Sequence, residues 1–316
     1  MATFTAYDQV GKKEDISSII TNISPTKTPF QTMISGEGIH NIVHQWQEDS
    51  LISAAANAQV EGAAAPTEVA NATVLRSNTT QILAKQAKAS GTTDAIKSYG
   101  RDTELSYQLS LRAAELKRDF EFALVGSAAV SVAGSVSVAR TMNGYQQMIT
   151  LTGGSAPVVL NGVTATAAGV AALTGSTSAA LTEAMVLTIA QQLYTNGTDP
   201  TTIMVKPADS LKIAAFATAT GRSRYLDANG AKAKQIVNVV DTYVTPFGEL
   251  KMVINRFQRT ADALIFEDDM WRKLTLRNWF RTTLAQVGDA TPVSITGEFS
   301  LKHRNYAASG LITGLG

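Results

Sequence analysis

The sequence predicts an α+β fold with a projecting hairpin, a long helix and a compact α/β unit. Two strand-like runs, Val43–Asp49 and Val74–Leu83, flank an Ala/Gly-rich stretch, and neither alternates cleanly enough between apolar and polar residues to bury one face. Residues 101–125 have helical periodicity, and strand and helix signals alternate from Leu181 to Asp269.

The composition suits a protein that covers its surface with further copies of itself. Of the 316 residues, 17% are charged, against roughly 25% in soluble domains, and the net charge is +1. That balance excludes a global basic field for nucleic acid or an anionic membrane. The chain has no cysteine, no signal-like start and no apolar run of membrane-spanning length. We therefore expect a protein made in a reducing cytoplasm, with no membrane partner.

Residues 1–42 are predicted to form an N-terminal arm that is largely extended, because prolines at 25 and 29 favour extended backbone before them. A short helix is expected around Asp15–Ile20. A disordered terminus is the alternative. An arm that docks on a protein surface is favoured by Phe30 and by four isoleucines with helical spacing, Ile16, Ile19, Ile20 and Ile23.

The hairpin region, residues 43–93, has no obvious support in the rest of the sequence. An isolated two-stranded hairpin is marginal in water, so we expect a neighbouring copy of the chain to support it. Its tip, residues 53–73, is rich in alanine and is predicted to be a long loop. After the hairpin, Ser90–Asp94 is expected to cap a short helix, Ala95–Tyr99, that Gly100 ends.

The strongest helical signal covers Arg101–Val125 and stops at Gly126–Ser127. About 25 residues at 1.5 Å each would give a rod nearly 40 Å long. One stripe of this helix is apolar: Leu105, Leu109, Ala113, Leu116, Phe120 and Leu124. The charged residues are expected to lie away from that stripe: Arg112, Glu115, Lys117, Asp119 and Glu121.

The second half of the chain alternates between strand and helix signals. In residues 126–180, strands are expected at Thr150–Val159 and Gly162–Leu173, with a flexible linker as the alternative. One helix should run from Leu181 to Asn196–Gly197, and another should start at Pro207. Further strands are predicted at Ile203–Val205, Ile236–Val244, Leu250–Asn255, Ala263–Glu267, Trp271–Arg277 and Val293–Phe299, the last returning to the region of the long helix.

No constellation of side chains predicts catalytic, cofactor-binding or metal-binding residues. His40 and His44 have the spacing of a helical metal pair, but the residues around His44 favour a strand. We interpret His303 as structural, because no nucleophile motif accompanies it. Glu267–Asp269 follow a predicted strand and are interpreted as turn residues rather than a cation site.

Basic side chains offer only weak candidates, and no glycine-rich phosphate loop is complete. An isopeptide crosslink from Lys85 or Lys88 to an asparagine of a neighbour is conceivable, although exposed strand lysines more often serve solubility. The best basic patch is formed by Arg222, Arg224, Lys232 and Lys234. Tyr225 is its one aromatic residue, so salt bridges between subunits or a solvated loop are favoured over nucleic-acid binding.

Two separated motifs resemble one family. They are Ile23-Ser24-Pro25-Thr26-Lys27-Thr28-Pro29-Phe30 in the arm, and Gly100-Arg101-Asp102-Thr103-Glu104-Leu105-Ser106-Tyr107-Gln108-Leu109 followed by Glu115-Leu116-Lys117-Arg118-Asp119 in the long helix. Both are similar to segments of the SU10-like major head protein family, which has the HK97 fold of tailed-phage major capsid proteins. The resemblance covers the whole chain and is weakest at residues 127–180.

The resemblance implies an N-terminal arm (1–42), an E-loop hairpin (43–93), a peripheral domain (94–180 and 270–316) with a spine helix (101–125), and an axial domain (181–269). It implies a subunit without an active site or cofactor that forms hexameric and pentameric capsomers of an icosahedral shell. The shell would assemble in the host bacterial cytoplasm and enclose double-stranded DNA without sequence-specific binding. Portal and scaffolding or decoration proteins would be further partners.

Other classes of protein stay open at this point. An encapsulin-like nanocompartment shell would share the fold and enclose cargo enzymes. The Thr/Ser/Ala bias would also suit a secreted β-rich adhesin, although no signal peptide is visible. A hydrolase would rest only on scattered histidines and acidic residues.

Overall fold

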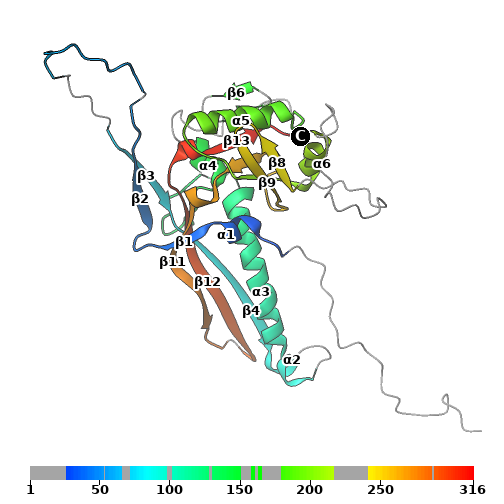
Figure 1. The fold of residues 1–316 in the computed structure, drawn as a ribbon. Coiled ribbons are helices and arrows are strands. Elements are labelled where there is room, and N and C mark those ends of the chain that lie inside the picture. The colour runs from blue at the N-terminus through cyan, green and yellow to red at the C-terminus, as the bar shows by residue number, and fades with distance from the viewer. Residues whose placement is uncertain are drawn as a thin grey trace, which may run out of the picture.

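The computed structural model describes residues 26–52, 54–65, 72–97, 102–127, 130–150, 158–160, 163–165, 179–216, 241–286 and 288–316. Within these ranges the chain forms a four-stranded sheet, a seven-stranded sheet and a separate two-stranded hairpin. Figure 1 shows the hairpin and the long helix α3 extending in different directions from the unit built around the seven-stranded sheet. None of the helices in these ranges is both long and apolar enough to cross a membrane.

The four-stranded sheet has the order β1-β11-β12-β4, with β1 parallel to β11 and the other pairs antiparallel. Its strands are β1 (Ser35–Gly38), β11 (Trp271–Thr283), β12 (Ala290–His303) and β4 (Gln81–Ser90). The helix α3 (Glu104–Glu121) lies along this sheet (Figure 1), where Lys85 of β4 contacts Glu115 and Asp119 at 3.0 and 2.8 Å. The short α2 (Gly91–Ala95) links the sheet to α3.

The seven-stranded sheet has the order β6-β5-β13-β10-β7-β9-β8. Its strands are β5 (Val158–Leu160), β6 (Val163–Ala165), β7 (Thr202–Val205), β8 (Thr242–Thr245), β9 (Gly248–Ile254), β10 (Ala263–Phe266) and β13 (Ser309–Thr313). The helices packed around it are α4 (Tyr145–Thr150), α5 (Glu183–Thr195) and α6 (Pro207–Phe216). One core cluster lies between α5, α6 and this sheet, and a second, around Phe30 and Trp271, joins the two sheets.

The predicted second hairpin strand, Val74–Leu83, is wrong in its extent. It divides into β3 (Val74–Thr79), which pairs with β2 (Val43–Glu48), and β4, which pairs with β12. The division falls at Thr80, whose backbone N–H donates to the carbonyl of Ile42 at 2.8 Å. The expectation that the rest of the chain offers no support therefore fails for β4, which is held between β12 and α3.

Helix ends also differ from the prediction. Ser90 is itself the N-cap, because its hydroxyl accepts from the N–H of Thr93, so α2 starts at Gly91 and precedes the predicted Ala95–Tyr99. Thr103 caps α3 in the same way. After Glu121 the helix continues as a π-helical turn, η1 (Phe122–Gly126), and ends where predicted.

In the arm, a short helix α1 (Pro29–Met33) interrupts the extended chain that was expected, because Pro29 suits the first turn of a helix. The arm is extended, as expected, at β1, which pairs with the edge of β11. The expected helix Asp15–Ile20 lies outside the described residues. In residues 126–180, α4 was not predicted and includes Thr150, which was expected to start a strand. The other described residues of the two expected strands form β5 and β6.

The predicted α/β unit is largely confirmed. The helices α5 and α6 and the strands β7, β9 and β10 lie within a few residues of their predicted positions. The strands β11 and β12 are longer than predicted, and β8 covers the described end of the predicted Ile236–Val244. Two 3₁₀ turns follow β10 and β12, η3 (Asp268–Met270) and η4 (Tyr306–Ala308). The pairing of β5 and β13 with the other strands places parts of segments 94–180 and 270–316 in the seven-stranded sheet.

Candidate assembly surface and its anchors

The outer half of the hairpin exposes large apolar side chains. Leu51 is 98% exposed and Val60 is 80% exposed. The tip turns at Val60–Ala63, where the N–H of Ala63 donates to the carbonyl of Val60 at 3.0 Å and Gly62 has a left-handed φ of +79°. Exposed apolar side chains on a projecting loop mark a surface that another protein covers.

The same part of the hairpin is acidic. Residues 48–75 contain Glu48, Asp49, Glu61 and Glu68 and no lysine or arginine. A partner surface would therefore be favoured by positive charge as well as by apolar contact.

The hairpin begins at a packed root. Trp46 of β2 is buried, and Glu48 pairs with Arg76 of β3 at 2.9 Å between Oε2 and Nε. The guanidinium of Arg76 lies 4.6 Å from the centre of the Tyr306 ring. Burial raises the pKa of Glu48, and Arg76 opposes that shift. These contacts connect the hairpin to the 3₁₀ turn that follows β12.

Below the root, a buried amide holds the end of β3. Asn78 Nδ2 donates to the backbone carbonyls of Leu301 and Asn143 at 2.7 and 3.2 Å. Its Oδ1 accepts from the backbone N–H groups of Asn143 and Thr79, both at 2.9 Å. All four hydrogen-bonding positions of this amide are thus occupied, which fixes its orientation and that of the strand.

The division between β3 and β4 is held by a buried carboxylate. Glu298 of β12 is 2% exposed and accepts from the Thr80 hydroxyl at 2.7 Å. Two guanidinium groups flank it, Arg140 at 2.5 Å and Arg277 at 2.9 Å. Because a buried carboxylate is stable only with such partners, this cluster orders the point from which the hairpin projects.

The arm is anchored by a second buried carboxylate. Glu121, at the end of α3, accepts from the backbone N–H groups of Phe30 and Gln31 at 2.8 and 3.0 Å, and from Asn255 Nδ2 at 2.7 Å. It supplies the N-terminal cap of α1 that Thr28 does not provide. Burial raises the pKa of Glu121, while its N–H donors act in the opposite direction.

The ring of Phe30 completes this anchor. It is fully buried and makes edge-to-face contacts with Tyr145, Phe266 and Trp271, at centroid distances of 6.0, 5.5 and 5.8 Å. The predicted docking of the arm is confirmed for Phe30, whose socket lies within the same chain, whereas the four isoleucines lie outside the described residues.

One face of the four-stranded sheet is partly exposed among the described residues, although Glu298 and Pro292 of β12 are buried on it. In β4, alternate side chains such as Lys85 face α3, whereas Ile82, Ala84, Gln86 and Lys88 are exposed on the other face. Phe280 of β11 pairs with Thr296 of β12, which pairs with Ala84, so these three side chains share that face. Ile82 and Phe280 are 47% and 40% exposed, so this outer face carries two exposed large apolar side chains, and Lys88 lies further along β4 on the same face.

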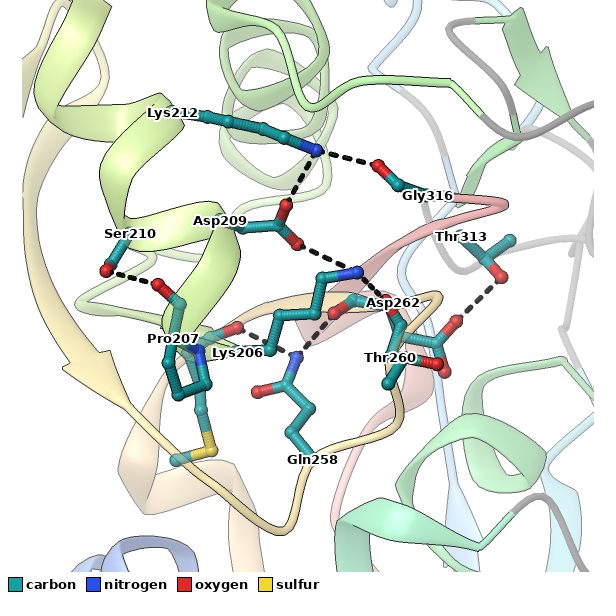
Figure 2. Close-up of polar contacts among 11 residues, drawn as sticks. Lys206, Pro207, Asp209, Ser210, Lys212, Gln258, Thr260, Asp262, Thr313 and Gly316 are labelled. Atoms are coloured by element: carbon teal, nitrogen blue, oxygen red, sulfur yellow. Dashed lines mark hydrogen bonds and ion pairs between the residues drawn. The ribbon is translucent and has the colours of Figure 1, made fainter.

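A polar network of the seven-stranded unit fixes α6 (Figure 2). Asp209 is fully buried, and the amines of Lys206 and Lys212 lie 3.6 and 3.0 Å from its carboxylate oxygens. Lys212 also donates to the carbonyl of Gly316 at 2.8 Å, and Lys206 donates to that of Thr260. These contacts hold α6 against Gly316, which follows β13, and against the loop before β10.

The histidines have structural surroundings. His303 is fully buried between the rings of Trp271 and Tyr306, and its Nε2 lies 2.9 Å from the Ser309 hydroxyl. Burial lowers the pKa of His303 to about 3, so the imidazole is neutral. His44 is in strand β2, as predicted, and stacks on Trp46. Among the described residues, no cluster of three or more potential ligands could hold a metal ion.

The acidic and basic candidates have separate positions. Glu267 follows β10, and Asp268 and Asp269 start the turn η3, which confirms the turn interpretation. Lys85 is held by two carboxylates of α3, whereas Lys88 is exposed. The crosslink therefore stays a prediction that these contacts favour less for Lys85. The predicted basic patch around Arg222 lies outside the described residues.

Comparison with solved structures identifies the fold. The capsid of an empty GTA particle has a TM-score of 0.61 at 12% identity, covering 96% of each chain. The holo-SrpI encapsulin complex from Synechococcus elongatus PCC 7942 has a TM-score of 0.59 at 8% identity, covering 96% of this chain and 92% of that one. The fold is therefore the HK97 fold of phage capsids, which encapsulin shells share.

Sequence similarity separates these possibilities. The family model described as SU10 major capsid protein matches residues 2–316. The major capsid protein of Escherichia phage Phieco32 is 32% identical over 341 residues, covering 98% of this chain and 96% of that protein. The chain belongs to the SU10 major capsid protein family. Its role is that of a tailed-phage major capsid protein in the virion, rather than that of an encapsulin shell or an adhesin.

Proposed function

We propose that copies of this chain form hexameric and pentameric capsomers of an icosahedral shell, in which the hairpin of one copy rests on the outer face of the four-stranded sheet of the next. One observation supports this arrangement above the others. The hairpin exposes Leu51 and Val60 on an acidic ribbon, and the outer face exposes Ile82 and Phe280, with Lys88 further along β4. The two surfaces complement each other in both polarity and charge.

The predicted domains would divide this work. Within the predicted hairpin region (43–93), β2, β3 and the tip would join subunits, whereas β4 would present the outer face together with β11 and β12 of the peripheral domain. The axial domain (181–269) would surround the five- and six-fold centres. We further propose that the shell assembles in the bacterial cytoplasm with portal and scaffolding or decoration proteins. It would enclose double-stranded DNA without sequence-specific contacts, since the net charge of +1 provides no global basic field. Family membership implies a structural subunit rather than an enzyme.

A charge-reversal pair tests the interface. Glu61 lies in the exposed tip turn, and Lys88 has no ion-pair partner among the residues that the structure describes. We expect Glu61→Lys and Lys88→Glu each to reduce shell formation by about tenfold, because each places like charges together. The double variant should restore shell formation, measured by sedimentation and negative-stain microscopy.

A matched control keeps this test specific. Glu249→Lys reverses an exposed acidic residue on the distant strand β9 and should assemble normally. Normal shells from both single variants would remove Lys88 from the interface. Failure of the double variant to recover, with each single variant folded, would exclude the proposed pairing.

A further inference from the structure

An exposed aromatic patch lies where the spine helix ends. Phe122, in the π-helical turn η1, is 54% exposed. A Cβ on Gly126 would meet both the Phe122 ring and the backbone carbonyl of Phe257, so the two phenylalanines are neighbours. The Arg118 guanidinium is 6.0 Å from the Phe257 ring. We call Phe122, Phe257 and Arg118 the aromatic patch.

The patch has unmet interactions within the described part of the chain. The Nε of Arg118 is buried there without a hydrogen-bond partner. A half-exposed phenylalanine beside an incompletely paired guanidinium suits an occupant that has both an apolar face and negative charge.

The chain preceding residue 26 starts beside this patch. The N–H of Phe30 donates to Glu121, one residue before Phe122, and Gln31 Nε2 donates to the carbonyl of Lys117 at 2.9 Å. Helix α1 also packs against η1. Ile23 precedes Pro29 by six residues, which span at most about 20 Å. Residues shortly before Ile23 can therefore reach the patch of their own copy.

The sequence before Ile23 has the chemistry that the patch requires. Ile16, Ile19, Ile20 and Ile23 follow the i, i+3, i+4, i+7 spacing of one helical face. The acidic pair Glu14–Asp15 stands at the start of this run, where carboxylates also favour a helix N-terminus.

We propose that residues 15–23 form an amphipathic helix whose isoleucine face covers Phe122 and Phe257 of the same copy, with Glu14–Asp15 facing Arg118. The short tether favours the same copy, because it gives the segment an effective concentration in the millimolar range. The arm would then have two anchors on one subunit, the Phe30 socket and the aromatic patch, before any shell forms.

Because the chain has no cysteine, a disulfide pair tests this contact in the full chain without background. Ile20→Cys combined with Phe122→Cys should form an intramolecular disulfide under mild oxidation. The yield should be about tenfold above that of Ser18→Cys combined with Phe122→Cys, since Ser18 lies about 160° from Ile20 around such a helix. Non-reducing electrophoresis and peptide mass spectrometry of unassembled subunits give the result.

Each outcome decides the proposal. Equal yields from the two pairs would overturn it, and disulfide-linked dimers would assign the patch to a second copy and overturn it as well. Phe122→Ser in the full chain gives an independent measurement, because release of the arm should speed trypsin cleavage at Lys27 about tenfold relative to the unchanged chain. An unaltered cleavage rate would also overturn the proposal. Since both measurements use unassembled subunits, they are separate from the test of shell assembly.

Discussion

The two ends of the hairpin reverse the usual distribution of polar and apolar residues. Its base buries an amide and a carboxylate, Asn78 and Glu298, each with a full set of partners. Its outer half leaves Leu51 and Val60 exposed. Fixed polar geometry at the base sets the direction of the ribbon, while apolar surface at the far end is available to a neighbouring copy. A subunit of a shell needs both properties in one element.

The comparison predicts that changes at the base act on folding and changes at the outer half act on assembly. The largest effect is expected from Glu298→Ala, which leaves Arg140 and Arg277 facing each other without their carboxylate. We expect a loss of about 3–5 kcal/mol in the free energy of unfolding. Urea denaturation of unassembled subunits measures it, with exposed Glu249→Ala as the control. A change below about 0.5 kcal/mol would show that the cluster does not hold the base.

A smaller loss is expected from Asn78→Ala. The variant leaves the carbonyl of Leu301 and the N–H of Asn143 without partners in a buried site, at a cost of about 2–3 kcal/mol. The matched control is Asn57→Ala in the exposed outer half, which should change stability by less than about 0.5 kcal/mol. Equal melting temperatures for the two variants would refute the contrast between base and outer half.

At the outer half, Leu51→Ser with Val60→Ser should leave the free energy of unfolding within about 0.5 kcal/mol of the unchanged chain. Shell formation should be lost, because both side chains would be buried only against a neighbour. Val136→Ser is the matched control, since Val136 is fully exposed in a loop outside the hairpin. Negative-stain microscopy reports the outcome, and normal shells from the double variant would contradict the proposed role.

The smallest effect concerns the packed root of the hairpin around Glu48 and Arg76, which lies between its base and its outer half. The pKa of Glu48 is raised by burial, so the stability that this group contributes is fully present below pH 4.5 and is lost as the pH rises through its raised pKa. In Glu48→Gln this dependence should disappear. The stability of the unchanged chain relative to the variant should therefore fall with rising pH, by up to about 1 kcal/mol. Urea denaturation between pH 4 and pH 7 tests it, and parallel curves would show that Glu48 does not titrate as proposed.

Much of the fold was predictable because it depends on local pattern. The apolar stripe and Gly126 place the spine helix within three residues at its start and one at its end. Pro207 similarly marks the start of α6. Of the candidate assembly surface, the sequence predicted only that the hairpin needs a partner. Glu121 was placed away from the apolar stripe and is instead buried, because the N–H groups that satisfy it belong to the arm, about ninety residues earlier. The only sequence signal for this contact between Glu121 and the arm was the proline before Phe30, which marks a helix start.

The sequence by itself determined the periodic helices, the buried strands of the α/β unit and a hairpin without an apolar face, since side-chain spacing and turn residues act over a few neighbours. Only the tertiary structure decided where Val74–Leu83 divides and which polar groups are buried. Thr80 meets Glu298 across more than two hundred residues, and that carboxylate is stable in the interior only because Arg140 and Arg277 reach it from two other elements. Such an arrangement has no local pattern, because its free energy depends on partners that the fold alone brings together.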